Sequence, residues 1–411
     1  MKTKSFIFCS LCVVLLICNA CEEPLSQNKY NDNTKLWPAF DPASSKVGYI
    51  NEKGEMVIPA QFKRAYFFCD GVANVFTPDD KTQFIDTKGN VVYTLPEGEV
   101  CDTYFYNGCL KFNKSLPSSY DIAPKSGLYD RHFNVVLPDN FRDLGAMSKE
   151  GLVATEYGYF NKKGELALTF DTVTFDVHAK SFITYNYGDF YDGVAEVSVS
   201  RYNNGHLSST LGAINTKGEW VIDTTTYMEL RPVGGGLLAY RTAINYDKYG
   251  LMDTHGNKVT EPIFAGVQNF EDNDLLPVCR EHGKWGYVDK TGTMRIEPKF
   301  HWGEPFHEGV AWAWDADDSN TNYYLIDTHG NILIDFGMDV MPRTCLHNGL
   351  IGIEVIDRVN NKNVFKYIDK NNHTIYSWER DPAKQETLMT HLLLPSRVPP
   401  TINNPESELN R

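Results

Sequence analysis

A short phrase of hydrophobic and polar positions recurs along the chain and predicts its secondary structure. It has a bulky residue, an aliphatic residue and then Asp or Asn, with Gly three positions later, as in FIDTKG from Phe84 and YVDKTG from Tyr287. The short apolar stretches around each turn-forming centre predict β-strands. Seven more copies begin at Tyr49, Leu128, Tyr159, Ala213, Leu251, Leu325 and Tyr367.

The polar centre of the phrase predicts a tight hairpin turn. An Asp or Asn side chain accepts hydrogen bonds from backbone amides just ahead of it, and Gly tolerates a positive φ. Asn372, which replaces Gly in the last copy, suits the same conformation, whereas Phe133 in the Leu128 copy predicts a different turn. The turn residues predicted most clearly are Asp86 and Gly89, Asp253 and Gly256, Asp289 and Gly292, and Asp327 and Gly330.

A second recurring phrase predicts a third strand for each unit. It reads DGVANV from Asp70, DGVAEV from Asp192 and EGVAWA from Glu308. The nine units follow one another at intervals of 31 to 54 residues, and a three-stranded meander cannot bury its apolar face alone. We therefore expect an all-β fold of tandem three-stranded antiparallel meanders, stacked as an open or propeller-like array. The uneven spacing favours an open or distorted array.

One copy is complete enough to show a family resemblance. KWGYVDKTG, from Lys284 to Gly292, is followed by Phe300, Phe306 and EGVA. These residues resemble the WG-repeat family of bacterial proteins, which is named for a Trp-Gly pair before the Asp phrase. Most other copies replace the Trp, as in Val47-Gly48, and the resemblance covers about residues 47 to 378. It implies an all-β repeat array without a general catalytic activity.

The N-terminus predicts export and a lipid anchor. Lys2 and Lys4 precede an apolar stretch from Phe6 to Ile17, which is the order of a secretory signal peptide and too short to span a membrane. Ala20 and Cys21 resemble a lipobox, in which Cys21 would be acylated, although Cys18 replaces the usual Leu. An ordinary signal peptide with an incidental cysteine is the alternative.

This interpretation divides the chain into four segments. They are a signal peptide at 1–20, a lipidated flexible tether at 21–36, the repeat array at 37–378, and a short helix with a disordered tail at 379–411. Glu22-Glu23 resembles the acidic export tag of surface lipoproteins in the Bacteroides group. We therefore expect attachment to the bacterial outer membrane, at the cell surface or the periplasmic face.

Charge and cysteine usage exclude several kinds of partner. The formal net charge is −14, and loss of the two lysines of the leader makes it −16, which disfavours nucleic acid. The cysteines of the array are not spaced like metal ligands, so we expect them to be small buried hydrophobic residues. One incidental disulfide is the alternative. His255 and His329 each lie in a THG turn, and we expect them to be solvent-exposed turn residues and not a pair of metal ligands. We expect no metal and no cofactor. The five cysteines concerned are Cys69, Cys101, Cys109, Cys279 and Cys345.

Two tryptophans stand out when the repeats are aligned. Positions that match Trp312 and Trp314 in other copies are mostly polar or small, such as Asn74 and Glu196. We therefore predict an exposed aromatic platform at Trp312 and Trp314, beside Asp315 and Asp317, that binds a sugar or a partner loop. The alternative is that both indoles are covered by the neighbouring insertion or pack between units. The acidic segment that begins at Asp315 lacks the Gly and Glu of a calcium loop. We therefore expect it to form a hairpin loop.

These features favour a non-catalytic surface or periplasmic lipoprotein that acts as a protein- or glycan-binding or scaffolding module. Its membrane contact would be the lipid anchor. Two other functions remain open. One is a carbohydrate-active hydrolase that uses Asp315 and Asp317, since propeller-like folds can host such chemistry, and the other is a structural component of an envelope complex.

Overall fold

The computed structural model describes residues 34–114, 125–170, 181–203, 205–271, 274–280, 283–316, 321–360 and 362–380. The predicted signal peptide, Cys21, nearly all of the tether, Asp317 and the C-terminal residues 381–411 lie outside the described residues. The described residues form β-strands and no α-helix. Accordingly, they contain no helix with the length and apolar composition needed to cross a membrane.

The strands build small antiparallel sheets, which we call blades 1 to 9 in chain order. Blade 1 contains β1 (Trp37–Asp41), β2 (Lys46–Ile50) and β3 (Met56–Phe62), and blade 2 contains β4 (Arg64–Cys69), β5 (Val72–Phe76), β6 (Thr82–Asp86) and β7 (Val91–Thr94). Blade 3 contains β8 (Glu99–Cys101), β9 (Cys109–Lys114), β10 (Ser126–Asp130) and β11 (Val135–Phe141), and blade 4 contains β12 (Leu152–Thr155), β13 (Gly158–Asn161) and β14 (Leu166–Leu168). Blades 5 and 6 share one seven-stranded sheet of β15 (Ser181–Tyr187), β16 (Val194–Asn203), β17 (His206–Asn215), β18 (Trp220–Gly234), β19 (Leu237–Thr242), β20 (Tyr249–Asp253) and β21 (Lys258–Phe264). Blades 7 to 9 contain β22 (Gly266–Val267), β23 (Leu276–Cys279), β24 (Trp285–Val288) and β25 (Met294–Phe300); β26 (Trp302–Gly303), β27 (Val310–Ala316), β28 (Thr321–Asp327) and β29 (Ile332–Gly337); and β30 (Val340–Pro342), β31 (Leu350–Asp357), β32 (Lys362–Asp369) and β33 (Thr374–Arg380).

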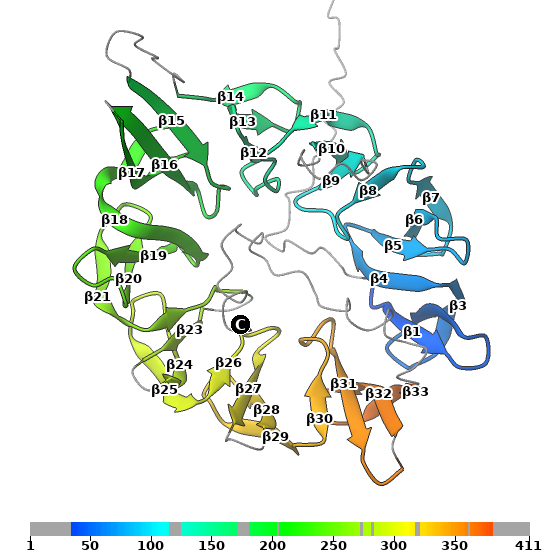
Figure 1. Cartoon of the computed structure of the whole chain (residues 1–411). Coiled ribbons are helices and arrows are strands. Elements are labelled where there is room, and N and C mark those ends of the chain that lie inside the picture. The colour runs from blue at the N-terminus through cyan, green and yellow to red at the C-terminus, as the bar shows by residue number, and fades with distance from the viewer. Residues whose placement is uncertain are drawn as a thin grey trace, which may run out of the picture.

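The blades follow one another around a ring, so that blade 9 lies beside blade 1 (Figure 1). Within each blade, consecutive strands pair antiparallel. The fifteen-residue β18 pairs with β17 through its first part and with β19 through its second, and so joins blades 5 and 6. The described residues therefore form nine blades in a propeller-like, all-β array, as the sequence predicted.

The boundary of each sheet differs from the predicted unit. The DGVANV strand, β5, pairs with the strand that leads into the following Asp turn, with Val72 opposite Asp86. It therefore belongs to the sheet of the next turn. Most blades also add a strand before it, such as β4 in blade 2, which gives four strands in place of three.

The predicted hairpin turns are present. At the first of them, Asp86 Oδ1 accepts hydrogen bonds from the amides of Lys88 (2.9 Å) and Asn90 (2.8 Å), and Gly89 has a φ of 85°. Asn372 takes the place of Gly with a φ of 66°. The same geometry recurs at Asp253 and Gly256, Asp289 and Gly292, and Asp327 and Gly330.

Phe133 adopts the same turn, so the prediction of a different turn at this copy is wrong. Its φ is 59°, and its amide donates to the carbonyl of Asp130 at 3.0 Å. The Phe133 ring stacks on Tyr93 with centroids 4.0 Å apart and packs against Phe84 and Phe105. Aromatic packing against blade 2 thus offsets the backbone strain that a side chain incurs at positive φ.

The turn glycines are also required by the neighbouring blade. A Cβ atom at Gly330 would lie 2.7 Å from Cγ2 of Ile296 in blade 7, and one at Gly54 would lie 2.3 Å from the carbonyl oxygen of Ile375 in blade 9. The positive φ and the close approach of the preceding blade therefore both require Gly at these positions.

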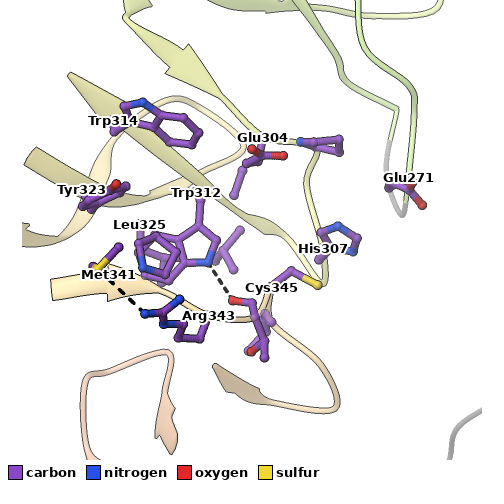
Figure 2. Close-up of a pocket in the computed structure, with 16 residues that line it drawn as sticks. Glu271, Glu304, His307, Trp312, Trp314, Tyr323, Leu325, Met341, Arg343 and Cys345 are labelled. Carbon is purple, nitrogen blue, oxygen red and sulfur yellow. Dashed lines mark hydrogen bonds between the residues drawn. The ribbon is translucent and has the colours of Figure 1, made fainter. Parts of the chain in front are cut away.

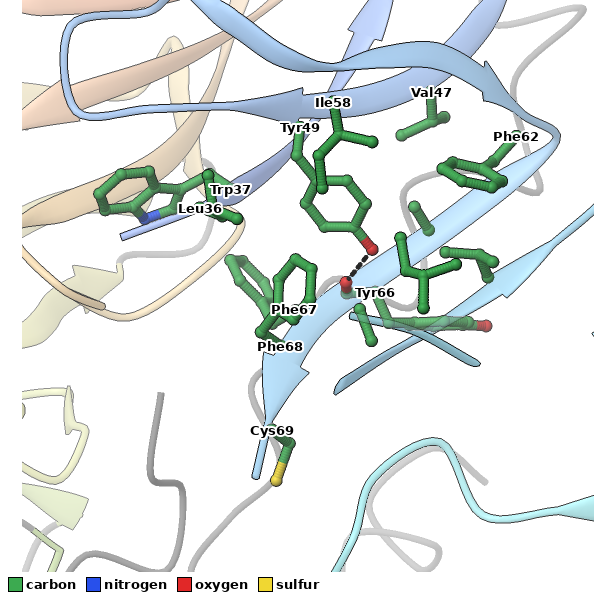
Figure 3. Close-up of a cluster of buried hydrophobic side chains, with 14 of the residues drawn as sticks. Leu36, Trp37, Val47, Tyr49, Ile58, Phe62, Tyr66, Phe67, Phe68 and Cys69 are labelled. Atoms are coloured by element: carbon green, nitrogen blue, oxygen red, sulfur yellow. Dashed lines mark hydrogen bonds between the residues drawn. The ribbon is translucent and has the colours of Figure 1, made fainter. Parts of the chain in front are cut away.

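The bulky first residue of the phrase links successive blades. Where it is Tyr, its ring is buried and its hydroxyl donates to a backbone carbonyl of the next blade. The bonds are Tyr49 to Tyr66 (2.7 Å), Tyr159 to Gly188 (2.8 Å) and Tyr287 to Glu304 (2.9 Å). Figure 3 shows the first of them within the buried cluster of blades 1 and 2.

The acid that opens the second phrase forms another link. Its carboxylate accepts a hydrogen bond from a Gly amide in the corresponding turn of the next blade. The pairs are Asp70 with Gly108 (3.1 Å), Glu150 with Gly193 (2.8 Å), Asp192 with Gly236 (2.9 Å) and Glu308 with Gly349 (3.0 Å). This acid is therefore an inter-blade contact in addition to a turn residue.

The ring is closed by the same kind of contact. The hydroxyl of Tyr367 in blade 9 donates to the carbonyl of Pro38 at 2.9 Å, and Trp37 Nε1 donates to the carbonyl of His347 at 3.0 Å. One hydrophobic cluster contains Trp37 together with Phe365 and Trp378. Blades 1 and 9 therefore pack as neighbours, and the array is a closed ring, in contrast to the open arrangement that the spacing favoured.

We expect Tyr367→Phe to lower the free energy of unfolding by about 1–2 kcal/mol, because the buried carbonyl of Pro38 would lose its donor. Tyr246→Phe is the matched control, since Tyr246 is 68% exposed. Urea unfolding followed by circular dichroism measures both. An unchanged midpoint for Tyr367→Phe would contradict a stabilising hydrogen bond between blades 9 and 1.

Candidate ligand cavity between blades 8 and 9

A cavity of about 400 Å³ lies between blades 8 and 9 (Figure 2). Blade 8 contributes residues of β27 and β28 and of the turn before β27. Blade 9 contributes β30 and the segment that follows it. The side chains that shape the cavity are Glu271, Glu304, His307, Trp312, Trp314, Tyr323, Leu325, Met341, Arg343 and Cys345.

Trp312 is buried, with 5% of its surface exposed, so the prediction of an exposed indole is wrong for this residue. Its Nε1 donates to the carbonyl of Thr344 at 2.9 Å, and its ring packs against Phe336 with centroids 5.2 Å apart. The physical reason is the ring itself. Because the next blade covers the second face of each strand, the equivalent Asn74 and Ala239 are buried as well.

Trp314 is partly exposed and lines the cavity. It belongs to a row of rings in which Trp285 contacts Trp302 (4.6 Å between centroids), Trp302 stacks on Trp314 (5.7 Å), and Trp314 contacts Tyr323 (5.8 Å). Packing by Trp302 and Tyr323 fixes the orientation of the Trp314 indole. The structure thus keeps one of the two predicted tryptophans as an accessible aromatic surface.

Asp315 does not line the cavity. Its Oδ1 accepts hydrogen bonds from Lys284 Nζ at 3.1 Å and from the amide of His301 at 3.0 Å. The carboxylate thereby ties the end of β27 to the loop between β25 and β26. Asp317, the second acid of the predicted platform, lies outside the described residues.

Arg343 is a cavity residue that the sequence did not single out. Its guanidinium pairs with the fully buried carboxylate of Glu354, which also accepts a hydrogen bond from Asn363 Nδ2 at 2.8 Å. Arg343 Nε is buried and has no hydrogen-bond partner within the described part of the chain. It sits in a connection between strands outside both recurring phrases, so the repeat pattern gave no signal for it.

His307 and Cys345 form a second polar feature of the cavity wall. The imidazole of His307 and the thiol of Cys345 both line the cavity, and Figure 2 shows the sulfur of Cys345 turned toward the ring. Burial lowers the pKa of His307, but the interactions with Cys345, Glu271 and Glu304 outweigh it and raise that pKa to about 9. The imidazole is therefore predominantly cationic at neutral pH.

The five described cysteines are all free thiols, and none is fully exposed. Across the described ranges, no group of three or more His, Cys, Asp or Glu side chains is placed to hold a metal ion. His255 and His329 are exposed in their turns, where their amides donate to Asp253 and Asp327.

Comparison with protein families identifies the repeat. The family described as "WG containing repeat" matches residues 48–77, 249–285 and 285–313. The chain contains WG repeats. The third match includes Trp312 and the turn of His307, so it covers part of the blade 8 wall of the cavity, and it ends before Trp314. A comparison of the sequence with curated proteins found no match.

The chain is similar to several solved structures, each at low sequence identity. BamB from Moraxella catarrhalis has 9% identity and a TM-score of 0.33, over 77% of this chain and 88% of that chain. Porphyromonas gingivalis dipeptidyl peptidase 4 has 11% identity and a TM-score of 0.44, over 78% and 60%. The WD40 domain of SCAP from fission yeast has 12% identity and a TM-score of 0.28, over 70% and 67%.

These likenesses concern the fold and carry no argument about activity. The WG repeats and the ring of blades support a repeat-built binding or scaffold module.

The burial of the two indoles predicts different effects of their removal. We expect Trp312→Ala to lower the free energy of unfolding by about 3–5 kcal/mol, the range for a large aromatic residue lost from a core. Trp314→Ala should cost less, because part of its surface is already in water. Urea unfolding of both variants tests this, and equal losses would contradict the assigned burial.

Proposed function

We propose that this WG-repeat chain is a non-catalytic, lipid-anchored binding module of the bacterial envelope, and that the cavity between blades 8 and 9 binds a short glycan. The observation that carries this proposal is the partly exposed indole of Trp314, held between Trp302 and Tyr323 at the cavity wall. A rigid ring of this kind offers an apolar face to the C–H groups of a sugar.

The polar groups of the cavity suit the hydroxyls of a sugar. Glu304 offers acceptors, while the imidazolium of His307 and the guanidinium of Arg343 offer donors. A largely apolar cavity with a few convergent polar groups, in the volume range of about 300–1,000 Å³, is typical of small-ligand sites. The 400 Å³ cavity meets this description.

A carbohydrate-active hydrolase is the alternative. Asp315, one of the two acids that suggested it, is held by Lys284 and His301 away from the cavity. Glu271 and Glu304 are the acids that line it. Hydrolysis would need two carboxylates facing each other across the bound sugar, and cleavage of the ligand during binding assays would reveal it.

The binding proposal predicts that Trp314→Ala weakens glycan affinity by at least about tenfold, as expected when stacking worth about 1.4 kcal/mol is lost. The protein would be the mature chain with Cys21→Ser, which prevents acylation. A glycan array selects the ligand, and calorimetric titration gives the affinity.

Trp220→Ala is the matched control, because Trp220 is exposed on β18 and does not line the cavity. Unchanged affinity for Trp314→Ala, with the ligand still bound, would exclude the cavity as the glycan site.

The anchor is tested separately. We expect Cys21→Ser to abolish incorporation of a clickable palmitate analogue and to release the protein from the membrane fraction, because an acyl chain attached to Cys21 would supply the membrane affinity. Cys18→Ser is the control and should retain the label. Labelling of the Cys21→Ser protein would contradict acylation at this residue.

A further inference from the structure

We propose that Cys345 and His307 form a reactive thiol site in the cavity wall, which captures small disulfides as a mixed disulfide on Cys345. This chemistry does not require a bound glycan, although His307 lines the same cavity as Trp314.

The geometry places a nucleophile and a cation beside open volume. Cys345 lies in the segment between β30 and β31, and His307 lies in the turn between β26 and β27, so two blades bring them together. Both line the 400 Å³ cavity, and both are partly exposed. A small reagent that enters the cavity can therefore reach the sulfur.

The other cysteines show what burial alone does to a thiol in this fold. Burial raises the pKa of Cys101 to about 12 and that of Cys109 to about 11, and it also raises the pKa of Cys279. Cys69 is buried and its thiol donates to the carbonyl of Phe105 at 3.3 Å. These four positions favour the protonated, unreactive thiol.

Cys345 differs because it lines the cavity beside the imidazole of His307, toward which its sulfur is turned (Figure 2). The titratable groups that face His307 are Cys345 from blade 9 and Glu271 and Glu304 from the blade 7 and 8 segments, and their interactions raise the pKa of His307 to about 9. Arg343 adds a second cation to the same cavity. Positive charge beside a cysteine favours the nucleophilic thiolate.

The reaction is thiol–disulfide exchange. The Cys345 thiolate attacks one sulfur of a small disulfide, the S–S bond of the reagent breaks, and the second thiol leaves as a thiolate that takes a proton from the medium. The disulfide is the oxidant, and one of its two sulfurs is reduced. No other described cysteine lines the cavity, so the mixed disulfide has no neighbouring thiol to resolve it.

The probe is oxidised glutathione, added without glycan to the folded mature chain that carries Cys21→Ser, so that no thiol at position 21 competes. Intact-mass spectrometry and peptide mapping follow the adduct between pH 6 and pH 10. We expect a single adduct, on Cys345. Cys345→Ser should abolish it, whereas Cys101→Ser and Cys109→Ser should leave it unchanged.

His307→Gln tests the role of the cation. At pH 7 we expect the rate to fall at least tenfold, and above pH 9.5 the variant and the parent should converge, because the parent imidazole has then lost its charge. Circular dichroism verifies that each variant is folded. If the His307→Gln protein is not folded, the same comparison is made with His307→Asn. Equal rates at pH 7, or an adduct distributed over the other cysteines, would overturn the proposal.

Because no glycan is present, this outcome does not depend on the binding proposal. A failed glycan titration would leave it standing, and a failed exchange reaction would leave glycan binding intact.

Discussion

The packing of each blade against the next is the interaction on which the rest of this structure depends. A sheet of three or four short strands has two faces and cannot bury either by itself. Stacking in a closed ring covers both faces of every blade, including those of blades 1 and 9. Residues of the two recurring phrases make the contacts between neighbouring blades. The Tyr hydroxyl, the opening acid and the turn Gly each contact a neighbouring sheet, so positions that shape a local hairpin also hold the ring together.

Much of this fold could be predicted from the sequence, because individual Asp, Asn and Gly residues determine where each hairpin turns. The Asp and Gly turn chemistry needs only five consecutive residues, which is why the turns at Asp86 and Asp327 were predicted correctly. Phe133 was not, because its conformation is stabilised by Tyr93 in another blade. Ring closure could not be predicted from the sequence either, because Pro38 and Tyr367, which form the closing hydrogen bond, lie at opposite ends of the array.

The candidate site divides in the same way. Trp314 could be found because the repeats provide an internal comparison of equivalent positions. The same comparison misjudged Trp312, since small or polar residues at that position accommodate a neighbouring blade instead of facing water. His307, Arg343 and Cys345 come from turns and connections whose neighbours belong to different blades. Only the three-dimensional packing brings such residues to one cavity, and no spacing rule along the chain reports it.

The contact of Tyr367 with Pro38 and of Trp37 with His347 has a mechanical consequence. Between every other pair of neighbouring blades the polypeptide is continuous, whereas the described residues of blades 9 and 1 are joined by side-chain packing and hydrogen bonds alone. The ring therefore has one non-covalent seam. Tension applied to the chain ahead of residue 34, or behind residue 380, would act on this seam before it reached any other blade. The order in which the blades separate under load is thus set by where the circle begins and ends.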